Sequence, residues 1–469
     1  LLSGPPFRFN KATMRSVALL LAALVLAAPA TAWVNTNAKR RIYLATHVVR
    51  VRTEFSANND GSDAASTYDV VFADGEAAHI SVVRAEQVRT TSSPLLAVTH
   101  TQCIPPSDGF TTFTVALPSP VAAGASANIK VAAYFTHVLT PFPAEITQED
   151  AQLVLFNGDH FVPSPYTTAK QVTTVKLPAG AEDFSDSEPP VKQDGESIKY
   201  GPYADKAAFS TSPMRIHFTN NSPFATFTTV DKEIEVSHWG NIAVEEQYDL
   251  KNTGAALKGG FARIDYQMRM AKSASFSSLT ARLPVFAADV YYRDIIGNIS
   301  TSHVRHDDDS VTMEIEPRFP LFGGWKTQWY QGYNLPTEPY LTQDGDTYAL
   351  TVDFGVPFEN AVTDELVVKV VLPERASVQS VEPPVEVDRQ ADGRRFTYMD
   401  SSFNGGRPVL FLKAFNLVDK SNGPLVVTYT LPGGSLLAEP LMLVTAFFLV
   451  FMSYSLLSRL DFSLTPKSA

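Results

Sequence analysis

The densest group of side chains that could do chemistry lies at residues 303–309, where two histidines and three aspartates occur together. Imidazole and carboxylate groups bind divalent metal ions, and Asp307 with Asp309 forms an Asp-x-Asp pair like those of sugar-nucleotide transferases. The cluster lies between two strand-like runs, residues 300–305 and 310–316. Aspartate is also common in turns, because its carboxylate accepts hydrogen bonds from nearby backbone amides. The sequence therefore favours a hairpin turn here and predicts no bound metal and no cofactor.

Other signatures of catalysis are absent from the sequence. It contains no Gly-rich phosphate loop, no His-Glu-x-x-His zinc helix and no Gly-x-Ser-x-Gly elbow. Cys103 is the single cysteine, which excludes an intramolecular disulfide and a zinc site made of several thiolates. It is interpreted as a small buried apolar residue, with a reactive thiol as the alternative. The net charge of −11 argues against a nucleic-acid partner, and we predict no catalytic residue in this chain.

Two Asn-x-Ser sequons could carry N-linked glycans. Asn298 is the stronger candidate, because polar residues follow it and predict an exposed segment. Asn220 is the weaker candidate, because Pro223 directly follows the serine of its sequon and such a proline often impairs modification.

Residues 317–336 are dense in aromatic residues and glycine. Aromatic side chains dominate the energetics of interfaces, so this stretch could dock a partner, and its rings could also stack on a sugar. It could equally be a corner of the core, where glycine permits tight turns and aromatic rings fill the interior. The candidate interface residues are Trp325, Trp329, Tyr330 and Tyr333.

Two apolar segments decide where these residues are positioned. Residues 17–30 form an uncharged apolar run that follows a short basic start and ends at a small-x-small cleavage signal, residues 30–32. Residues 1–32 are therefore interpreted as upstream residues followed by a signal peptide. Residues 436–460 are long and apolar enough to cross a bilayer.

The second apolar segment predicts a single-pass type I membrane protein. A cleaved signal places the main body in the lumen, and the basic residues after the span agree with the positive-inside bias. Residues 461–469 would then form a short cytosolic tail. Thr445 and Ser453 lie inside the span, where they could bond to a membrane partner or back to carbonyls of their own helix.

The region between the two apolar segments predicts a mainly β protein. Runs of β-branched and aromatic residues recur from Trp33 to about Pro432, separated by clusters of Gly, Pro, Asn and Asp. The 32 prolines fit strand ends and loops better than helices.

A short repeat divides this region into two related halves. Residues 175–181 resemble residues 371–376, and both place Leu-Pro at the end of a strand-like run. We place the divide near residue 228. This predicts two lumenal, sandwich-like β domains at residues 33–228 and 229–435, followed by one transmembrane helix.

Several long segments resemble the ribophorin I family, subunit 1 of the oligosaccharyltransferase of the endoplasmic reticulum. They are residues 237–246, 290–294, 297–303, 317–326, 332–336 and 459–462, with a weaker match at residues 34–35. The resemblance implies an accessory role in the endoplasmic reticulum membrane, beside a multi-spanning catalytic subunit and a small membrane subunit. It also implies a glycan at Asn298. The lipid bilayer and a nascent polypeptide to be presented are the remaining expected partners.

Vertebrate members of the family carry a cytosolic helical domain after the membrane helix, implicated in ribosome contact. This sequence has only residues 461–469 there, so we expect a lumenal role without ribosome docking. The Trp-Trp-Asp motif of the catalytic family is absent, and one helix makes no groove for a polyprenyl carrier. The alternatives are a stand-alone adhesion or receptor ectodomain, and a lumenal metal enzyme that uses residues 303–309.

Overall fold

The computed structural model describes residues 33–87, 95–96, 98–101, 109–269, 274–299, 302–397, 400 and 405–460. Strands dominate these residues, and an apolar helix, α4 (Ala438–Leu457), follows them. The predicted fold class is therefore confirmed. The predicted signal peptide, Cys103 and the predicted tail lie outside the described residues.

The chain forms two compact units. Of the described residues, the first unit takes in those from Trp33 to Ala45, Val49–Val138 and Leu155–Phe218; the second takes in Thr46–Val48, Leu139–Val154 and those from Thr219 to Leu460. The predicted divide at residue 228 falls inside strand β17 (Ala225–Ser237), because pairing with the next strand already begins at Ala225. Long-range bonds that sequence periodicity does not reveal bring the two short segments into the second unit. His47 Nε2, for example, lies 2.9 Å from the Ala225 carbonyl oxygen.

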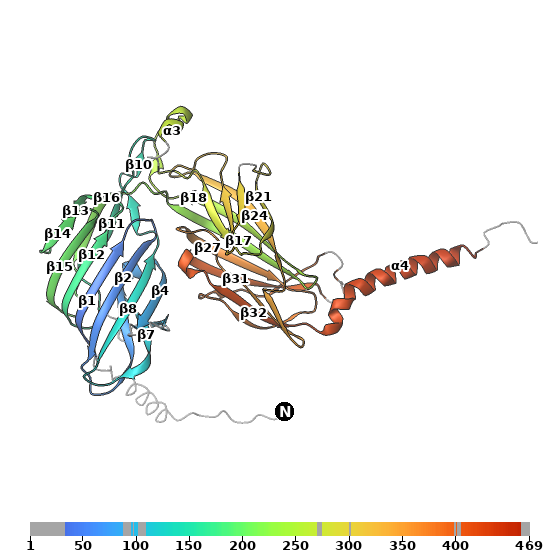
Figure 1. Ribbon diagram of the computed structural model, residues 1–469, viewed down its shortest axis with the longest axis horizontal. Coiled ribbons are helices and arrows are strands. Elements are labelled where there is room, and N and C mark those ends of the chain that lie inside the picture. Colours follow the sequence, from blue (N-terminus) through green and yellow to red (C-terminus); the bar gives the residue numbers. More distant parts are fainter. Residues whose placement is uncertain are drawn as a thin grey trace, which may run out of the picture. The chain divides into compact units, whose positions relative to one another are not determined.

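In the first unit, a large sheet has the order β14-β15-β12-β1-β2-β8-β4-β5, of which Figure 1 labels the strands from β14 to β4. Smaller sheets contain β13-β16-β11 and β3-β7-β6. Their bounds are β1 Trp33–Tyr43, β2 Val49–Asn59, β3 Ala65–Ala73, β4 Ile80–Gln87, β5 Leu95–Leu96, β6 Val98–Thr101, β7 Phe110–Val121, β8 Ser126–Phe135, β11 Leu153–Asp159, β12 Thr168–Lys176, β13 Ala181–Phe184, β14 Val191–Asp194, β15 Ser197–Lys206 and β16 Pro213–Thr219. A short helix, α2 (Asp74–Ala77), follows β3.

In the second unit, the large sheet has the order β21-β24-β18-β17-β27-β31-β29, and smaller sheets have the orders β28-β32-β26-β25 and β20-β23-β22. The remaining bounds are β9 Leu139–Pro141, β10 Glu145–Ile146, β18 Asn241–Asn252, β19 Ala256–Leu257, α3 Arg263–Arg269, β20 Leu279–Leu283, β21 Ala288–Asp294, β22 His303–His306, β23 Val311–Ile315, β24 Lys326–Pro336, β25 Leu341–Asp344, β26 Thr347–Asp353, β27 Val362–Val371, β28 Ser377–Glu382, β29 Asp388–Arg389, β30 Gly393–Arg395, β31 Arg407–Val418, η3 Asp419–Ser421, β32 Pro424–Thr430 and η4 Gly433–Leu437.

The two units repeat one topology. Each large sheet is built on a central parallel pair, β1 with β12 and β17 with β27, and the flanking strands follow in the same order. The smaller sheets also correspond, with β13-β16-β11 matching β28-β32-β26 and β3-β7-β6 matching β20-β23-β22. The short sequence repeat begins in the last residues of β12 and of β27, which hold equivalent places, and continues past their ends. The shared strand order supports the division into two related halves, which stays a prediction.

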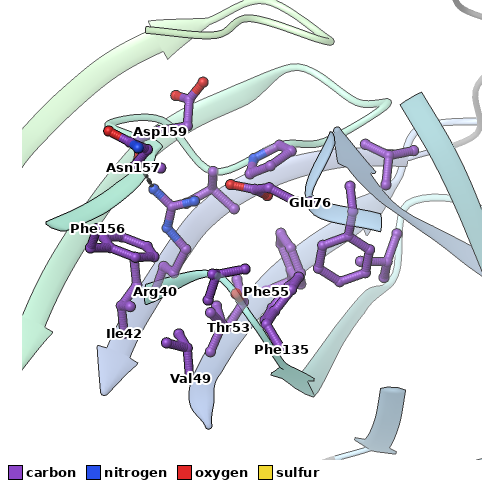
Figure 2. Close-up of a pocket in the computed structure, with 18 residues that line it drawn as sticks. Arg40, Ile42, Val49, Thr53, Phe55, Glu76, Phe135, Phe156, Asn157 and Asp159 are labelled. Atoms are coloured by element: carbon purple, nitrogen blue, oxygen red, sulfur yellow. Dashed lines mark hydrogen bonds between the residues drawn. The ribbon is translucent and has the colours of Figure 1, made fainter. Parts of the chain in front are cut away.

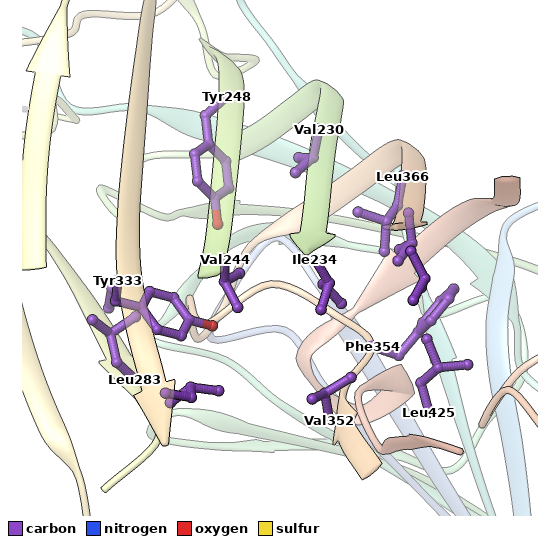
Figure 3. Packing of buried hydrophobic residues seen from close by; sticks show 14 of the residues in the cluster. Val230, Ile234, Val244, Tyr248, Leu283, Tyr333, Val352, Phe354, Leu366 and Leu425 are labelled. Carbon is purple, nitrogen blue, oxygen red and sulfur yellow. The ribbon is translucent and has the colours of Figure 1, made fainter. Parts of the chain in front are cut away.

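Alternating burial explains why the second unit is a sandwich. Along β17, Val230, Lys232, Ile234 and Val236 are buried, and the residues between them are half-buried, because successive side chains of a strand point to opposite faces. The inward side chains of the large sheet pack on those of the smaller sheets, as Figure 3 shows for Ile234 beside Val352. This core holds the second unit together and leaves hairpin tips and edges for contacts.

Helix α4 follows directly from the second unit. It combines strong helix formers with an uncharged apolar run, and η4 connects it to β32. Within the part of the chain that the structure describes, Gly433–Leu457 is the one segment long and apolar enough to cross a membrane, and the rest of the protein buries none of its apolar window. The predicted transmembrane helix is therefore present with an uncovered surface.

Candidate functional site

The histidine and aspartate cluster forms a hairpin. His303 and His306 lie on β22, which pairs with β23, and Asp307 N donates a hydrogen bond to the Ser310 carbonyl oxygen at 3.0 Å. The predicted hairpin turn is confirmed, and its side chains point into solvent without converging. Across the described residues, no group of three or more His, Cys, Asp or Glu side chains is arranged to hold a metal ion.

The aromatic stretch divides between core and surface. Trp329 and Tyr333 are only 4% and 5% exposed, because both point inward from β24. The interface prediction is therefore wrong for these two residues, and the core interpretation holds for them. Tyr330 points to the other face and is half-buried, and Trp325 is half-buried against the Phe322 ring at 5.5 Å. Both stay candidates for a docking surface.

Glycine is required where this stretch turns. A Cβ atom built on Gly323 would lie 1.8 Å from the Ala255 carbonyl oxygen, closer than any real contact. Gly332 similarly leaves room for the Tyr291 ring, whose hydroxyl donates to Glu245 at 2.7 Å. The glycines that the sequence shows between the aromatic residues thus permit close packing of backbone and ring.

The two sequons have different environments. Asn220 is 1% exposed, and its Oδ1 accepts a hydrogen bond from Ser222 N at 3.0 Å. A glycan would need space around Nδ2 that this buried side chain does not have, so the structure contradicts Asn220 as an acceptor. Asn298 is exposed on the loop after β21, and modification there stays a prediction.

An ion pair fixes the loop that carries Asn298. Arg318 donates through Nε and Nη2 to the Asp294 carboxylate, the latter at 2.9 Å, and also reaches the Asn298 carbonyl oxygen at 3.4 Å. This hydrogen bonding from Arg318 lowers the pKa of Asp294 to about 2 from an ordinary value of 3.8. The paired carboxylate therefore stabilises the loop only while it is ionised.

Acid is expected to remove this stabilisation. Because the folded pKa of Asp294 lies below its unfolded pKa, the contribution is complete above about pH 4 and is lost as pH falls toward about 2. Asp294→Asn should therefore cost about 1 kcal/mol at pH 6 and almost nothing at pH 2. Denaturant unfolding of both proteins at pH 6, 4 and 2 measures this. An equal difference at all three values would contradict it, and Asp308→Asn on the exposed hairpin is the control.

A buried ion pair, which the sequence analysis missed, lies in the core of the second unit. Lys232 Nζ lies 3.1 Å from Glu246 Oε1, and both residues are at most 2% exposed. Lys232 also donates to the Gly355 carbonyl oxygen at 2.9 Å. The second carboxylate oxygen accepts hydrogen bonds from Tyr248 at 2.7 Å and Gln331 at 2.9 Å. A signal existed, because Lys232 stands at an inward position between Val230 and Ile234.

The first unit places another cation at the equivalent position. Arg40 on β1 opposes Thr53 on β2, as Lys232 on β17 opposes Glu246 on β18. Arg40 donates through Nε to Thr173 Oγ1 at 3.2 Å and through Nη2 to the Asp159 carbonyl oxygen. Thr53 carries no charge, so the strand position that Glu246 holds in the second unit supplies no counter-charge to Arg40.

A mainly apolar cavity of about 40 Å³ lies beside Arg40 in the first unit. Ile42, Val49 and Phe55 line it together with Arg40 and Thr53, and the Glu76 carboxylate points toward the Arg40 guanidinium (Figure 2). Burial raises the pKa of Glu76, and the positive charge of Arg40 opposes that shift. The volume suffices for water molecules and leaves little space for an organic ligand.

The strand hairpin β17–β18 meets the start of α4. Trp239, at the hairpin tip, donates through Nε1 to Glu439 Oε2 at 2.9 Å. Arg407 joins this junction, because Nη2 lies 3.6 Å from Glu439 Oε1 and Nη1 donates to Glu235 at 3.1 Å. Helix α4 is thus tied to the large sheet of the second unit by side chains as well as by the chain itself.

The polar residues of α4 differ in their bonding. Thr445 donates through Oγ1 to the Leu441 carbonyl oxygen at 2.7 Å, which is the bond within the helix that the sequence left open as an alternative. The Thr445 hydroxyl is therefore not reserved for a partner. Ser453 is exposed on the helix and stays a candidate contact residue.

Among the residues that the structure describes, two β units of one topology precede one uncovered apolar helix that is long enough to cross a membrane, which is the architecture of a β-sandwich protein with a candidate membrane anchor. A family profile described as Ribophorin I matches residues 33–458. The chain belongs to the ribophorin I family.

Characterised relatives support this assignment. Dolichyl-diphosphooligosaccharide–protein glycosyltransferase subunit 1 of Caenorhabditis elegans is 40% identical over 442 residues, covering 93% of this chain and 74% of the relative. Subunit 1B of the same enzyme from Arabidopsis thaliana is 38% identical over 441 residues, covering 92% and 94%. Among solved structures, the M1 zinc metallopeptidase of Deinococcus radiodurans covers 44% of this chain and 42% of its own, with 10% identity and a TM-score of 0.28. That likeness is too weak to bear on fold or function.

Proposed function

We propose that this chain is a non-catalytic subunit of the oligosaccharyltransferase complex of the endoplasmic reticulum membrane. Its two β units lie in the lumen, and α4 crosses the bilayer once. The observation that carries the proposal is family membership over residues 33–458, together with relatives that are named as subunit 1 of this glycosyltransferase.

The architecture supports an accessory rather than a catalytic role. Transfer of an oligosaccharide from a polyprenyl carrier requires a groove at the level of the membrane and acidic groups that hold a divalent metal. A single helix offers a surface without a groove, and the most suggestive acidic cluster is an exposed hairpin turn. Catalysis then belongs to a separate, multi-spanning subunit beside this one.

Helix α4 supplies the docking surface within the bilayer. Its large apolar side chains are exposed along the helix, among them Phe447, Phe451 and Leu456. In a membrane, such a surface contacts lipid or packs against other helices. We assign it to a small membrane subunit and the catalytic subunit, and we assign stabilisation of the complex and presentation of nascent polypeptide to the lumenal units.

Depletion of this chain is expected to cause underglycosylation. The measurement is sequon occupancy on a reporter glycoprotein, combined with purification of the complex in mild detergent and identification of its subunits by mass spectrometry. Wild-type protein should restore both occupancy and complex. A variant in which Leu441–Leu457 is replaced by an unrelated apolar span should stay membrane-bound but recover less than a tenth of the partner subunits.

The helix replacement is matched to its purpose, because it preserves anchoring and both β units. Unchanged sequon occupancy and an intact complex after depletion would overturn the proposal. If the variant with the replaced helix recovered all partner subunits, the docking surface would lie on the lumenal units and not on α4.

A further inference from the structure

The tip of the β17–β18 hairpin exposes a tryptophan that the core does not use. Trp239 is 64% exposed, whereas Trp33 and Trp329 are buried and Trp325 is half-buried. Gly240 follows it with a φ of 103°, which lets the two strands turn within a few residues. A single exposed ring is ordinary, but this one contacts the start of α4, whose apolar side chains are also exposed, so the two together offer a continuous apolar surface.

The contact between Trp239 and the first turn of α4 indicates that a lipid bilayer covers this surface. Its indole nitrogen is bonded to Glu439, in the first turn of the helix, and the uncharged apolar run begins two residues later at Leu441. At 1.5 Å per residue, the bonded carboxylate lies only about 3 Å along the helix axis from the start of that run. In a bilayer spanned by α4, the ring would lie where the headgroup layer meets the hydrocarbon core, the depth that tryptophan side chains favour.

A cation lines the same small cavity as the ring. Arg375 is exposed on the turn after β27 and, with Trp239 and Ser435, lines a small cavity of about 40 Å³ at the start of α4. No hydrogen bond or ion pair links the Arg375 side chain to the described part of the chain, and the Ser435 Oγ is buried without a partner there. The one carboxylate that Trp239 contacts, Glu439, is already shared with Arg407.

We propose that the hairpin tip and the 373–376 turn form a second membrane contact, in which Trp239 enters the headgroup layer and Arg375 binds a lipid phosphate. A guanidinium presents several donors to phosphate oxygens, and an indole places its apolar body toward the acyl chains and its N–H toward polar groups. This contact would hold the second unit against the bilayer and restrict its motion about the end of the helix. It requires α4 to span the membrane but does not require the glycosyltransferase complex.

Lipid-borne quenchers test the proposal on the purified full chain in phosphatidylcholine nanodiscs. Because the chain has four tryptophans, the difference in emission between wild type and Trp239→Phe isolates Trp239. Lipids brominated high on the acyl chain should lower that difference emission at least twofold, and acrylamide in the aqueous phase should lower it by less than a fifth. The corresponding difference for Trp325→Phe should be insensitive to the brominated lipids.

A second substitution tests the role of Arg375. Arg375→Ala should reduce bromine quenching of Trp239 by at least a third, whereas Arg389→Ala, on an exposed ion pair elsewhere in the second unit, should leave it unchanged. If brominated lipid did not quench the emission of Trp239 and acrylamide did, the proposed membrane contact would be wrong. Quenching that appears only when other subunits are reconstituted would also overturn it, since a protein partner would then position the tip.

Discussion

Glu246→Gln should lower the free energy of unfolding of the second unit by about 3–5 kcal/mol, because it leaves the Lys232 ammonium buried without its counter-charge. The substitution preserves the size of the side chain but replaces one acceptor oxygen by an NH2 donor. If the amide oxygen keeps the hydrogen bonds from Tyr248 and Gln331, the new NH2 faces the Lys232 ammonium, which adds to the loss. Hydrogen exchange during denaturant titration measures the loss where it occurs. Amides of β17 and β18 should exchange at lower denaturant, and amides of β1 and β12 in the first unit should not change.

Two further variants make this result specific. Lys232→Met combined with Glu246→Gln removes both charges and should recover most of the loss, since a buried pair is rarely more stable than an apolar replacement of similar volume. Glu365→Gln breaks a surface ion pair in which Lys413 Nζ lies 2.8 Å from Glu365 Oε1. This substitution should lower the free energy of unfolding by less than about 1 kcal/mol. If Glu246→Gln behaved like Glu365→Gln, Lys232 would have to be neutral or hydrated in the core.

Trp329→Ala is expected to lower the free energy of unfolding of the second unit by about 3–5 kcal/mol. The ring stacks on Tyr248 with centroids 5.0 Å apart and meets Phe227 at 6.0 Å and Phe358 at 6.1 Å. Its removal would leave a cavity that the rigid large sheet cannot close, because the neighbouring residues lie on paired strands. The midpoint of thermal unfolding and the yield of folded protein measure this loss.

Trp325→Ala is the matched control for that substitution. Both residues belong to the same aromatic stretch, but Trp325 is half-buried and should cost no more than about half as much. A variant Trp329→Ala that kept its stability and lost partner subunits would show that the docking interpretation was right and the core interpretation wrong. Equal effects of the two substitutions on stability would contradict the division of the stretch between core and surface.

Much of the architecture could be predicted from local pattern. The alternation along β17, the apolar run of α4 and the Leu-Pro repeat at the ends of β12 and β27 are local signals, and local signals survive in sequence. The limits of the two units could not be predicted in the same way. His47 joins the second unit through a hydrogen bond with the Ala225 carbonyl oxygen. The sequence pattern near residue 47 does not predict a contact with a residue so distant along the chain.

The candidate site residues were harder to predict, because burial depends on which strands become neighbours. Trp329 and Tyr330 are adjacent in the sequence, yet one fills the core and the other faces outward, and only the register of β24 decides which. Asn220 belongs to a sequon as clear as that of Asn298, but the fold buries it. For Lys232 the local pattern was informative, because the alternation along β17 places it at an inward position. Its charge nevertheless argued against burial, so the sequence analysis did not predict it as a core residue.

The central parallel pairs also constrain the order of events during synthesis. Arg40 on β1 meets Thr173 on β12 across 133 residues, so β1 cannot gain its parallel neighbour until the chain has been made past Thr173. Until then β1 has only its antiparallel neighbour β2, and its other edge stays open to wrong pairing. The second unit repeats this delay with β17 and β27. A chain that is translated and folds from its N-terminus thus passes twice through a stage with an open central edge, and chaperones should act at those two stages.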